Sequence, residues 1–317
     1  MGWLNLGVLP LFHLFLGRMD REICLTTLLL SLLFLITLRL DRSRRQGPWF
    51  VYGLLWGVTL LTNPAVLSLF PFLLAWACYR SRQRGLSWGL PALVATLALM
   101  AVVAPWFVRN CQTFHQAVPF RDNFWLEVYA GKNGDISHSS LDALHPSLNL
   151  TEQEGCNQMG ELRYMAHKRQ QSLEFIRKHP GWFERVTLRR ILRTWTGFSG
   201  LPANGRFQEP LDPQEPFEPL NIAFCTTLTA LVVTGLYLVS GRCFLAAWPY
   251  LLDLLEFPMG YYVTNTNLRY RHPMDSEMVV LAAYACATLL QGRNGVAQKA
   301  GVPDPQQKAT PASGAEV

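Results

Sequence analysis

Apolar runs recur along the chain, and short polar stretches separate them. A straight membrane-spanning helix needs about 20 apolar residues, so the shorter runs are expected to be tilted or re-entrant. The pattern predicts an all-α polytopic membrane protein with about eight apolar segments and a mostly helical outer segment. The predicted apolar segments are residues 3–16, 23–38, 49–61, 64–79, 87–105, 219–240, 243–263 and 278–290.

These segments divide the chain into four parts. Residues 1–105 contain membrane segments 1–5, and residues 219–291 contain membrane segments 6–8. Residues 106–218 form an extracytoplasmic segment with equal numbers of acidic and basic residues. Residues 292–317 are predicted to form a disordered cytoplasmic tail, because they are polar and lack hydrophobic periodicity.

Basic residues are concentrated in two short loops. The chain has 317 residues, of which 50% are hydrophobic and 16% are charged, whereas soluble domains have about 25% charged residues. The net charge of +6 comes from residues 39–45, with four Arg and one Asp, and residues 79–86, with three Arg. The positive-inside rule places both loops on the cytoplasmic side. The charge therefore indicates a lipid bilayer as partner, and no nucleic acid.

Two helices are predicted in the outer segment. Residues 159–178 have an apolar stripe at helical spacing, and His179 and Pro180 are expected to end that helix. Residues 182–195 form a second amphipathic stretch, for which we favour a solvated face or contact with lipid headgroups over a phosphate site. This stretch contains four closely spaced arginines: Arg185, Arg189, Arg190 and Arg193.

Two further arginines on the outer side break the positive-inside pattern. Arg269 and Arg271 lie between the last two apolar segments. A cation is tolerated there where it binds an anion, and a guanidinium matches a phosphate bidentately. Alternatively, both arginines anchor the chain to lipid headgroups, with Tyr270 as part of an aromatic belt.

Two acidic residues lie inside an apolar segment. Asp253 and Glu256 are three residues apart and share a helix face. Charge at that depth is costly and indicates a function, here transport of an ion or a lipid-linked sugar. The interpretation slightly favoured is that Pro249 and Pro258 break the helix, so that both acids face a wet cavity or the membrane interface.

No metal or cofactor is predicted. The chain has no Walker loop and no GxGxxG or GxSxG motif, so nucleotide-driven transport and dinucleotide chemistry have no support. Cys111 and Cys156 are the only cysteines outside the apolar runs, and the sequence leaves open whether they pair. Four residues lie near one another without a known metal-ligand spacing: Asp135, His138, Asp142 and His145.

Several stretches, in their order and spacing, resemble a known family. The short helical pair of bacterial GT-C glycosyltransferases resembles GLLWGVTLLTNPAVLSLFPFLLAWACYR, and the family's exit from the following helix resembles PWFVRN. The outer segment of these proteins resembles HPSLNLTEQEG, ELRYMAHKRQQSLEFIRKHPGWF and RTWTGF, and their C-terminal signature resembles YYVTNTNLRYRHPMD. The subgroup is RgtA/B/C/D-like and is related to protein mannosyltransferases that use dolichyl phosphate mannose. The resemblance runs from about residue 20 to residue 291.

The resemblance implies a multi-pass enzyme of the bacterial inner membrane. Such an enzyme takes a sugar from a polyprenyl-phosphate carrier and passes it to a glycan, lipid or protein acceptor on the outer face. Carried over by position, Arg269 and Arg271 lie near the carrier phosphate with Tyr270 beside them, and Arg109 is a weaker candidate. Positive donors at a phosphate leaving group stabilise the charge that develops as the glycosidic bond breaks.

One feature of the family is absent from this sequence. The acid regarded as the base lies in the first outer loop of the superfamily, and the chain has no segment that matches that loop, so the catalytic residue is unknown. Asp20 and Glu22 match a later part of the pattern and do not receive the role. The alternative is therefore an N-terminally truncated, non-catalytic fragment or a lipid-carrier-binding protein, because transfer needs a base beside the acceptor hydroxyl.

Overall fold

The structure is a computed structural model. It describes residues 21–118, 120, 123–131, 144–198, 218–266 and 268–299, without the side chains of residues 21, 22, 218, 269 and 292–299. All regular structure in these ranges is helical, with no strand. The expectations for residues 1–20, including segment 3–16 and Asp20, lie outside this part of the chain, as does most of the predicted tail.

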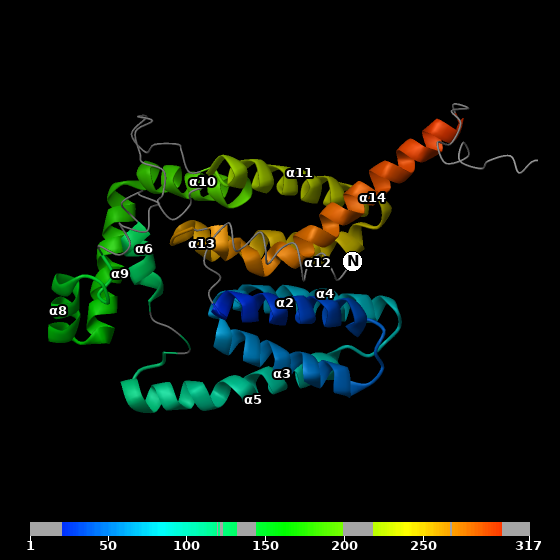
Figure 1. Cartoon of the computed structure of the whole chain (residues 1–317). Coiled ribbons are helices and arrows are strands. Elements are labelled where there is room, and N and C mark those ends of the chain that lie inside the picture. Colours follow the sequence, from blue (N-terminus) through cyan, green and yellow to red (C-terminus); the bar gives the residue numbers. More distant parts are fainter. Residues whose placement is uncertain are drawn as a thin grey trace, which may run out of the picture.

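The helices form three groups (Figure 1). The first is α2 (Arg21–Leu40), α3 (Gln46–Thr62), η1 (Pro64–Ser68), α4 (Leu69–Gln83) and α5 (Gly89–Phe114). The second is α11 (Glu218–Arg242), α12 (Phe244–Glu256), α13 (Met259–Val263), η2 (Leu268–Met274) and α14 (Asp275–Lys299). The third, at one end of the other two, is α6 (Phe124–Gly131), α8 (Leu150–Met159), α9 (Glu161–Lys178) and α10 (Pro180–Thr196).

The prediction of eight membrane segments is wrong in number. Within the described residues, four helices are long and apolar enough to cross a membrane, and they contain Ile23–Leu40, Gly89–Phe114, Pro219–Arg242 and Tyr270–Gln291. The other apolar helices are shorter: α3 has 17 residues, α4 has 15 and α12 has 13. At 1.5 Å per residue, 13 residues span about 20 Å, whereas the hydrocarbon core is about 30 Å thick. The described part of the chain is all-α and has membrane-spanning character.

One apolar core joins the first two groups of helices. It includes Leu30 and Leu33 of α2, Trp56 of α3, Leu254 of α12 and Met278 of α14, all buried. Many other large apolar side chains on the four long helices are exposed. A helix that is apolar on its exposed side as well as its buried side is typical of one that faces lipid.

Two glycines allow α3 to approach α5 closely. Gly53 and Gly57 are four residues apart, the small-residue spacing that lets membrane helices pack backbone to backbone. A Cβ atom on Gly53 would overlap the carbonyl of Ala95, and one on Gly57 would overlap the side chain of Val102. The pair of helices therefore depends on the absence of both side chains.

The two Arg-rich loops lie at the same end of the bundle. Asp41, just after α2, makes ion pairs with Arg80 at 3.2 Å and Arg84 at 3.0 Å, at the end of α4. Figure 1 shows the α2–α3 and α4–α5 connections at this end and the helices α6, α8 and α9 at the other. This arrangement agrees with the prediction that residues 39–45 and residues 79–86 lie on the same side of the membrane.

Several predicted helix ends agree with the structure. The turn expected at Asn63 and Pro64 separates α3 from η1, and the Asn63 side chain accepts a hydrogen bond from the Ala65 amide. The outer helix expected over 159–178 is α9, and it ends at Lys178, before His179. The apolar segment expected over 87–105 lies in α5, which continues beyond it to Phe114.

Candidate functional site

The outer helix α10 meets the α13–η2 connection at one end of the bundle. Pro180 occupies the first turn of α10, and Gly197 ends it in the left-handed conformation. The hydroxyl oxygens of Thr194 and Thr266 are 2.8 Å apart, and the indole of Trp195 donates to the hydroxyl of Tyr262 at 2.7 Å. Residues 264–266, 268 and 271–275 near this contact are buried.

Arg190 of α10 is buried at this junction. Its guanidinium donates to the backbone carbonyls of Tyr262, Val263 and Gly131, at 3.2 Å for Tyr262 and 3.0 Å for Val263. Burial, with a smaller contribution from the charge of Arg189, lowers the pKa of Arg190 to about 10. The side chain therefore remains charged at neutral pH and joins α6, α10 and the end of α13.

Two more arginines of α10 are also buried. Arg189 and Arg193 are 5% and 1% exposed, whereas Arg185 is exposed. The prediction of a solvated or headgroup-facing set is therefore wrong for Arg189, Arg190 and Arg193. The physical reason is that the α10 face bearing them packs against other helices rather than solvent. Burying this much positive charge is costly unless anionic or hydrogen-bonding groups surround it.

Arg271 lies in η2 and faces the carboxyl end of α10. Its Nε is 3.5 Å from Oδ1 of Asp275, and its Nη1 donates to the backbone carbonyl of Thr194 at 3.5 Å. His272 Nδ1 is 3.0 Å from the other carboxylate oxygen of Asp275. All three side chains are buried. Asp275 therefore offsets part of the positive charge that the sequence assigned to a carrier phosphate.

The other predicted phosphate-binding residues have different surroundings. The ring of Tyr270 stacks on Tyr261, with centroids 4.6 Å apart and an angle of 11° between the planes. The backbone of Arg269 belongs to η2, and its side chain lies outside the described atoms. Tyr270 and Arg271 are therefore placed in one short buried helix.

Arg109 belongs to a separate pocket at the end of α5. Its guanidinium lies over the Trp106 ring, with the Cζ atom 5.2 Å from the centroid, and donates to Asn110 at 3.0 Å. The pocket has a volume of about 310 Å³ and also contains Asn123 and Glu161. None of the described side chains of η2 lines it. The structure does not bring Arg109 together with Arg271 within the described contacts.

A pair of buried carboxyl groups lies between α12 and α14. Asp253 is fully buried, and Glu277 is 3% exposed and close enough to interact with it electrostatically. Neither oxygen of Asp253, nor Oε2 of Glu277, has a hydrogen-bond partner among the described residues. Glu256, which the sequence paired with Asp253, is half-buried at the end of α12. The electrostatic neighbour of Asp253 therefore comes from another helix.

The remaining candidates do not form a site in the described residues. Cys111 and Cys156 are not joined by a disulfide. His145 contacts Ser147, and no group of three or more His, Cys, Asp or Glu side chains in the described ranges is arranged to hold a metal ion. Asp135, His138 and Asp142 lie outside the described residues.

The sequence pattern identified the arginines of α10 and Arg271 but did not predict that they are buried. The four-residue spacing of Arg189 and Arg193 indicates one helix face without showing what covers it. Glu277 was not singled out, although it is an acid at the start of an apolar helix. Comparisons of the chain with known protein families, with curated proteins and with solved structures find no match, so the GT-C resemblance stays a prediction from sequence.

Proposed function

We propose that this chain is a membrane glycosyltransferase that takes a sugar from a polyprenyl-phosphate carrier and passes it to an acceptor at the membrane face next to α10. The observation that supports the proposal is the gathering of buried arginines at the junction of α10 and η2. Arg189, Arg190, Arg193 and Arg271 are all buried there, on two elements that touch. A positive potential in a low-dielectric setting favours a phosphate that gains charge as its glycosidic bond breaks.

The carrier would approach from the bilayer that the long apolar helices indicate. In this proposal Arg271 is the phosphate-binding residue, because it comes from the matched signature, and Asp275 holds its guanidinium in one orientation. Arg189, Arg190 and Arg193 of α10 add positive charge near the phosphate without contacting it in this proposal. The compartment is proposed to be the outer side of the bacterial inner membrane.

The second candidate is a lipid-carrier-binding protein without transfer activity. It needs only the cluster of buried arginines, because binding a phosphate requires no base beside an acceptor hydroxyl. A transferase also needs a base. Among the described residues, Asp253 and Glu277 are buried acids, and none of the contacts given above pairs either of them with a basic side chain. They lie within the bundle, and we do not assign either of them as the base.

The test uses the purified chain in liposomes with polyprenyl-phosphate sugars. We would measure sugar transfer to membrane acceptors and, separately, the binding of sugar-free polyprenyl phosphate. Transfer supports the enzyme, binding without transfer supports the second candidate, and the absence of both rejects the two together.

Two variants separate phosphate binding from structural support. Arg271→Ala and Asp275→Asn both break the same ion pair, so a purely structural role predicts that both weaken polyprenyl-phosphate binding. A phosphate role predicts that Arg271→Ala weakens binding while Asp275→Asn preserves or strengthens it, because the local charge becomes more positive. Arg177→Ala, at an exposed position in the last turn of α9, is the matched control for loss of one positive charge.

A further inference from the structure

An apolar groove runs between α4 and α12, at the end of the bundle that carries the Arg-rich loops. Its volume is about 590 Å³. Trp76 closes one side and donates its indole N–H to the carbonyl of Leu245 at 2.9 Å, which holds the two helices together. The lining is Phe72, Ala75, Trp76, Tyr79, Gln83, Phe244, Leu245, Trp248 and Leu252. Such a lining is compatible with a hydrocarbon chain.

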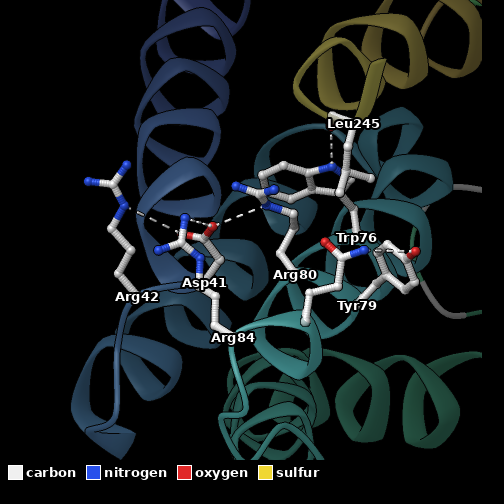
Figure 2. Close-up of polar contacts among 8 residues, drawn as sticks. Asp41, Arg42, Trp76, Tyr79, Arg80, Arg84 and Leu245 are labelled. Atoms are coloured by element: carbon white, nitrogen blue, oxygen red, sulfur yellow. Dashed lines mark hydrogen bonds and ion pairs between the residues drawn. The ribbon is translucent and has the colours of Figure 1, made fainter. Parts of the chain in front are cut away.

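Arginines converge next to this groove on a single carboxylate. Arg80, Arg84 and Arg42 have nitrogen atoms 3.2, 3.0 and 3.9 Å from the oxygens of Asp41, which is 2% exposed. Three positive charges therefore share one buried negative charge. Figure 2 shows the arrangement, with the arginines around Asp41.

Arg80 connects the charged cluster with the groove. Its guanidinium contacts Asp41 on one side and lies over the Trp76 ring on the other, with Cζ 5.9 Å from the centroid (Figure 2). The Arg80 and Arg84 side chains are 25% and 38% exposed, so each remains accessible despite its ion pair. At the same end of the groove, Gln83 donates to the hydroxyl of Tyr79 at 2.9 Å. Apolar walls thus end at polar and cationic side chains.

We propose that this groove binds an anionic phospholipid, with one acyl chain between α4 and α12 and the phosphate at Arg80 and Arg84. Charge complementarity selects this occupant, because a neutral or zwitterionic lipid would leave the excess positive charge unmatched. Guanidinium groups bind phosphate oxygens bidentately, and the basic end of a membrane protein faces the leaflet that is richer in anionic lipids. The site is at the other end of the bundle from α10 and η2 and is independent of the proposed function.

The test measures the lipids that remain bound to the purified full chain. The protein is reconstituted in equimolar dioleoylphosphatidylglycerol and dioleoylphosphatidylcholine, extracted in mild detergent, and examined by native mass spectrometry. We expect retention of phosphatidylglycerol over phosphatidylcholine. Each of Arg80→Ala and Arg84→Ala should weaken phosphatidylglycerol retention about fivefold. Arg44→Ala, an exposed position in the same basic end, should leave it unchanged.

Two more variants keep the proposal falsifiable if loss of an arginine disturbs folding around Asp41. Asp41→Asn frees the arginines from their carboxylate and should strengthen retention of phosphatidylglycerol. Ala75→Trp fills the groove and should weaken it. Equal retention of the two lipids, an effect of Arg44→Ala as large as that of Arg84→Ala, or weaker retention in folded Asp41→Asn protein would overturn the phosphate contact. Unchanged retention in folded Ala75→Trp protein would overturn the groove.

Discussion

The guanidinium of Arg190 donates a hydrogen bond to the backbone carbonyl of Gly131, which ties α10 to the end of α6. The other amino group of the same side chain reaches two carbonyls at the end of α13. One cation within α10 therefore joins the carboxyl ends of α6 and α13. A Cβ atom on Gly131 would overlap the Thr264 carbonyl and crowd this guanidinium, so the glycine is part of the same junction.

Replacing Arg190 with Lys should loosen the outer helices. A lysine keeps the charge but cannot donate to three carbonyls in fixed directions. Hydrogen bonds to charged groups contribute about 1.5–3 kcal/mol each, so we expect a loss of about 2–4 kcal/mol in the free energy of unfolding. Limited proteolysis in detergent would detect this loss as faster cleavage within residues 123–198. Arg177→Lys, at an exposed position, is the control, and equal protease resistance of both variants would refute the assignment.

Adding a methyl group at Gly53 should separate α3 from α5. The Cβ atom would overlap backbone atoms of Ala95, which no side-chain rotation relieves. Overpacking of this kind costs about 1–3 kcal/mol, and the contact with backbone places Gly53→Ala at the upper end. Gly47→Ala, also in α3, meets no atom within 4 Å and should stabilise slightly through helix propensity. The two thermal unfolding midpoints should therefore shift in opposite directions.

Tyr164, in the outer helix α9, should ionise only at a higher pH than an ordinary tyrosine. The Tyr164 hydroxyl donates to Glu152 at 2.6 Å, and Lys168 makes an ion pair with the same carboxylate at 2.7 Å. Burial first, and then the hydrogen bond to Glu152, raise the pKa of Tyr164 well above the usual 10.0. The folded state keeps the proton that the unfolded state releases, so stability is fully present below pH 10 and falls as the pH rises above it.

Tyr164→Phe should remove part of this alkaline loss. Absorbance at 295 nm would follow tyrosine ionisation while circular dichroism follows helix content. The wild-type chain should lose helix content earlier with rising pH than the variant, after allowance for the lower baseline stability of the variant. An identical alkaline profile in both proteins would show that Tyr164 is not the group responsible.

Neutralising Asp253 should raise stability. A fully buried carboxyl group without a hydrogen-bond partner among the described residues is costly when ionised. Asp253→Asn keeps the shape and removes the charge, so the thermal midpoint at neutral pH should rise. Glu256→Gln, at a half-buried position in the same helix, should change it little.

The same variant examines the transport hypothesis. If Asp253 carries an ion or a proton, Asp253→Asn abolishes counterflow in proteoliposomes. Intact counterflow would remove that hypothesis, and a lower midpoint in Asp253→Asn would contradict the stability argument. The thermal midpoint and the counterflow test separate claims, because the variant can gain stability and lose transport, or lose stability and keep transport.

Local patterns predicted some elements well and others poorly. Asn63 followed by Pro64 is a turn for reasons confined to those residues, and α9 ends before the residue that precedes Pro180, as local sterics require. The number of spanning helices depends on helix length, which apolarity alone does not determine. Pro105 lies inside α5, which continues to Phe114, and proline is tolerated within membrane-spanning helices more than in other helices.

Burial of charge was harder to predict than helix position. Nothing near Arg189 in the sequence shows which element covers its face of α10. Likewise, Asp253 and Glu277 come together only because α12 and α14 fold back along one bundle. Glu256 is nearer to Asp253 in sequence and shares its helix, yet it has a less buried environment. The sequence pattern therefore could not predict the contacts of the site that join segments far apart in the chain.

The hydroxyls of Ser31 in α2 and Ser276 in α14 lie 2.7 Å apart, although 245 positions separate them in the chain. A ribosome that adds about 5–20 residues per second needs about 12–50 seconds to make the intervening chain. During that interval α2 is already synthesised, while η2 and the start of α14, which pack against it, are not. The surface of α2 that packs against η2 and α14 is therefore exposed during synthesis and must be protected from non-native contacts. The membrane insertion machinery would provide that protection.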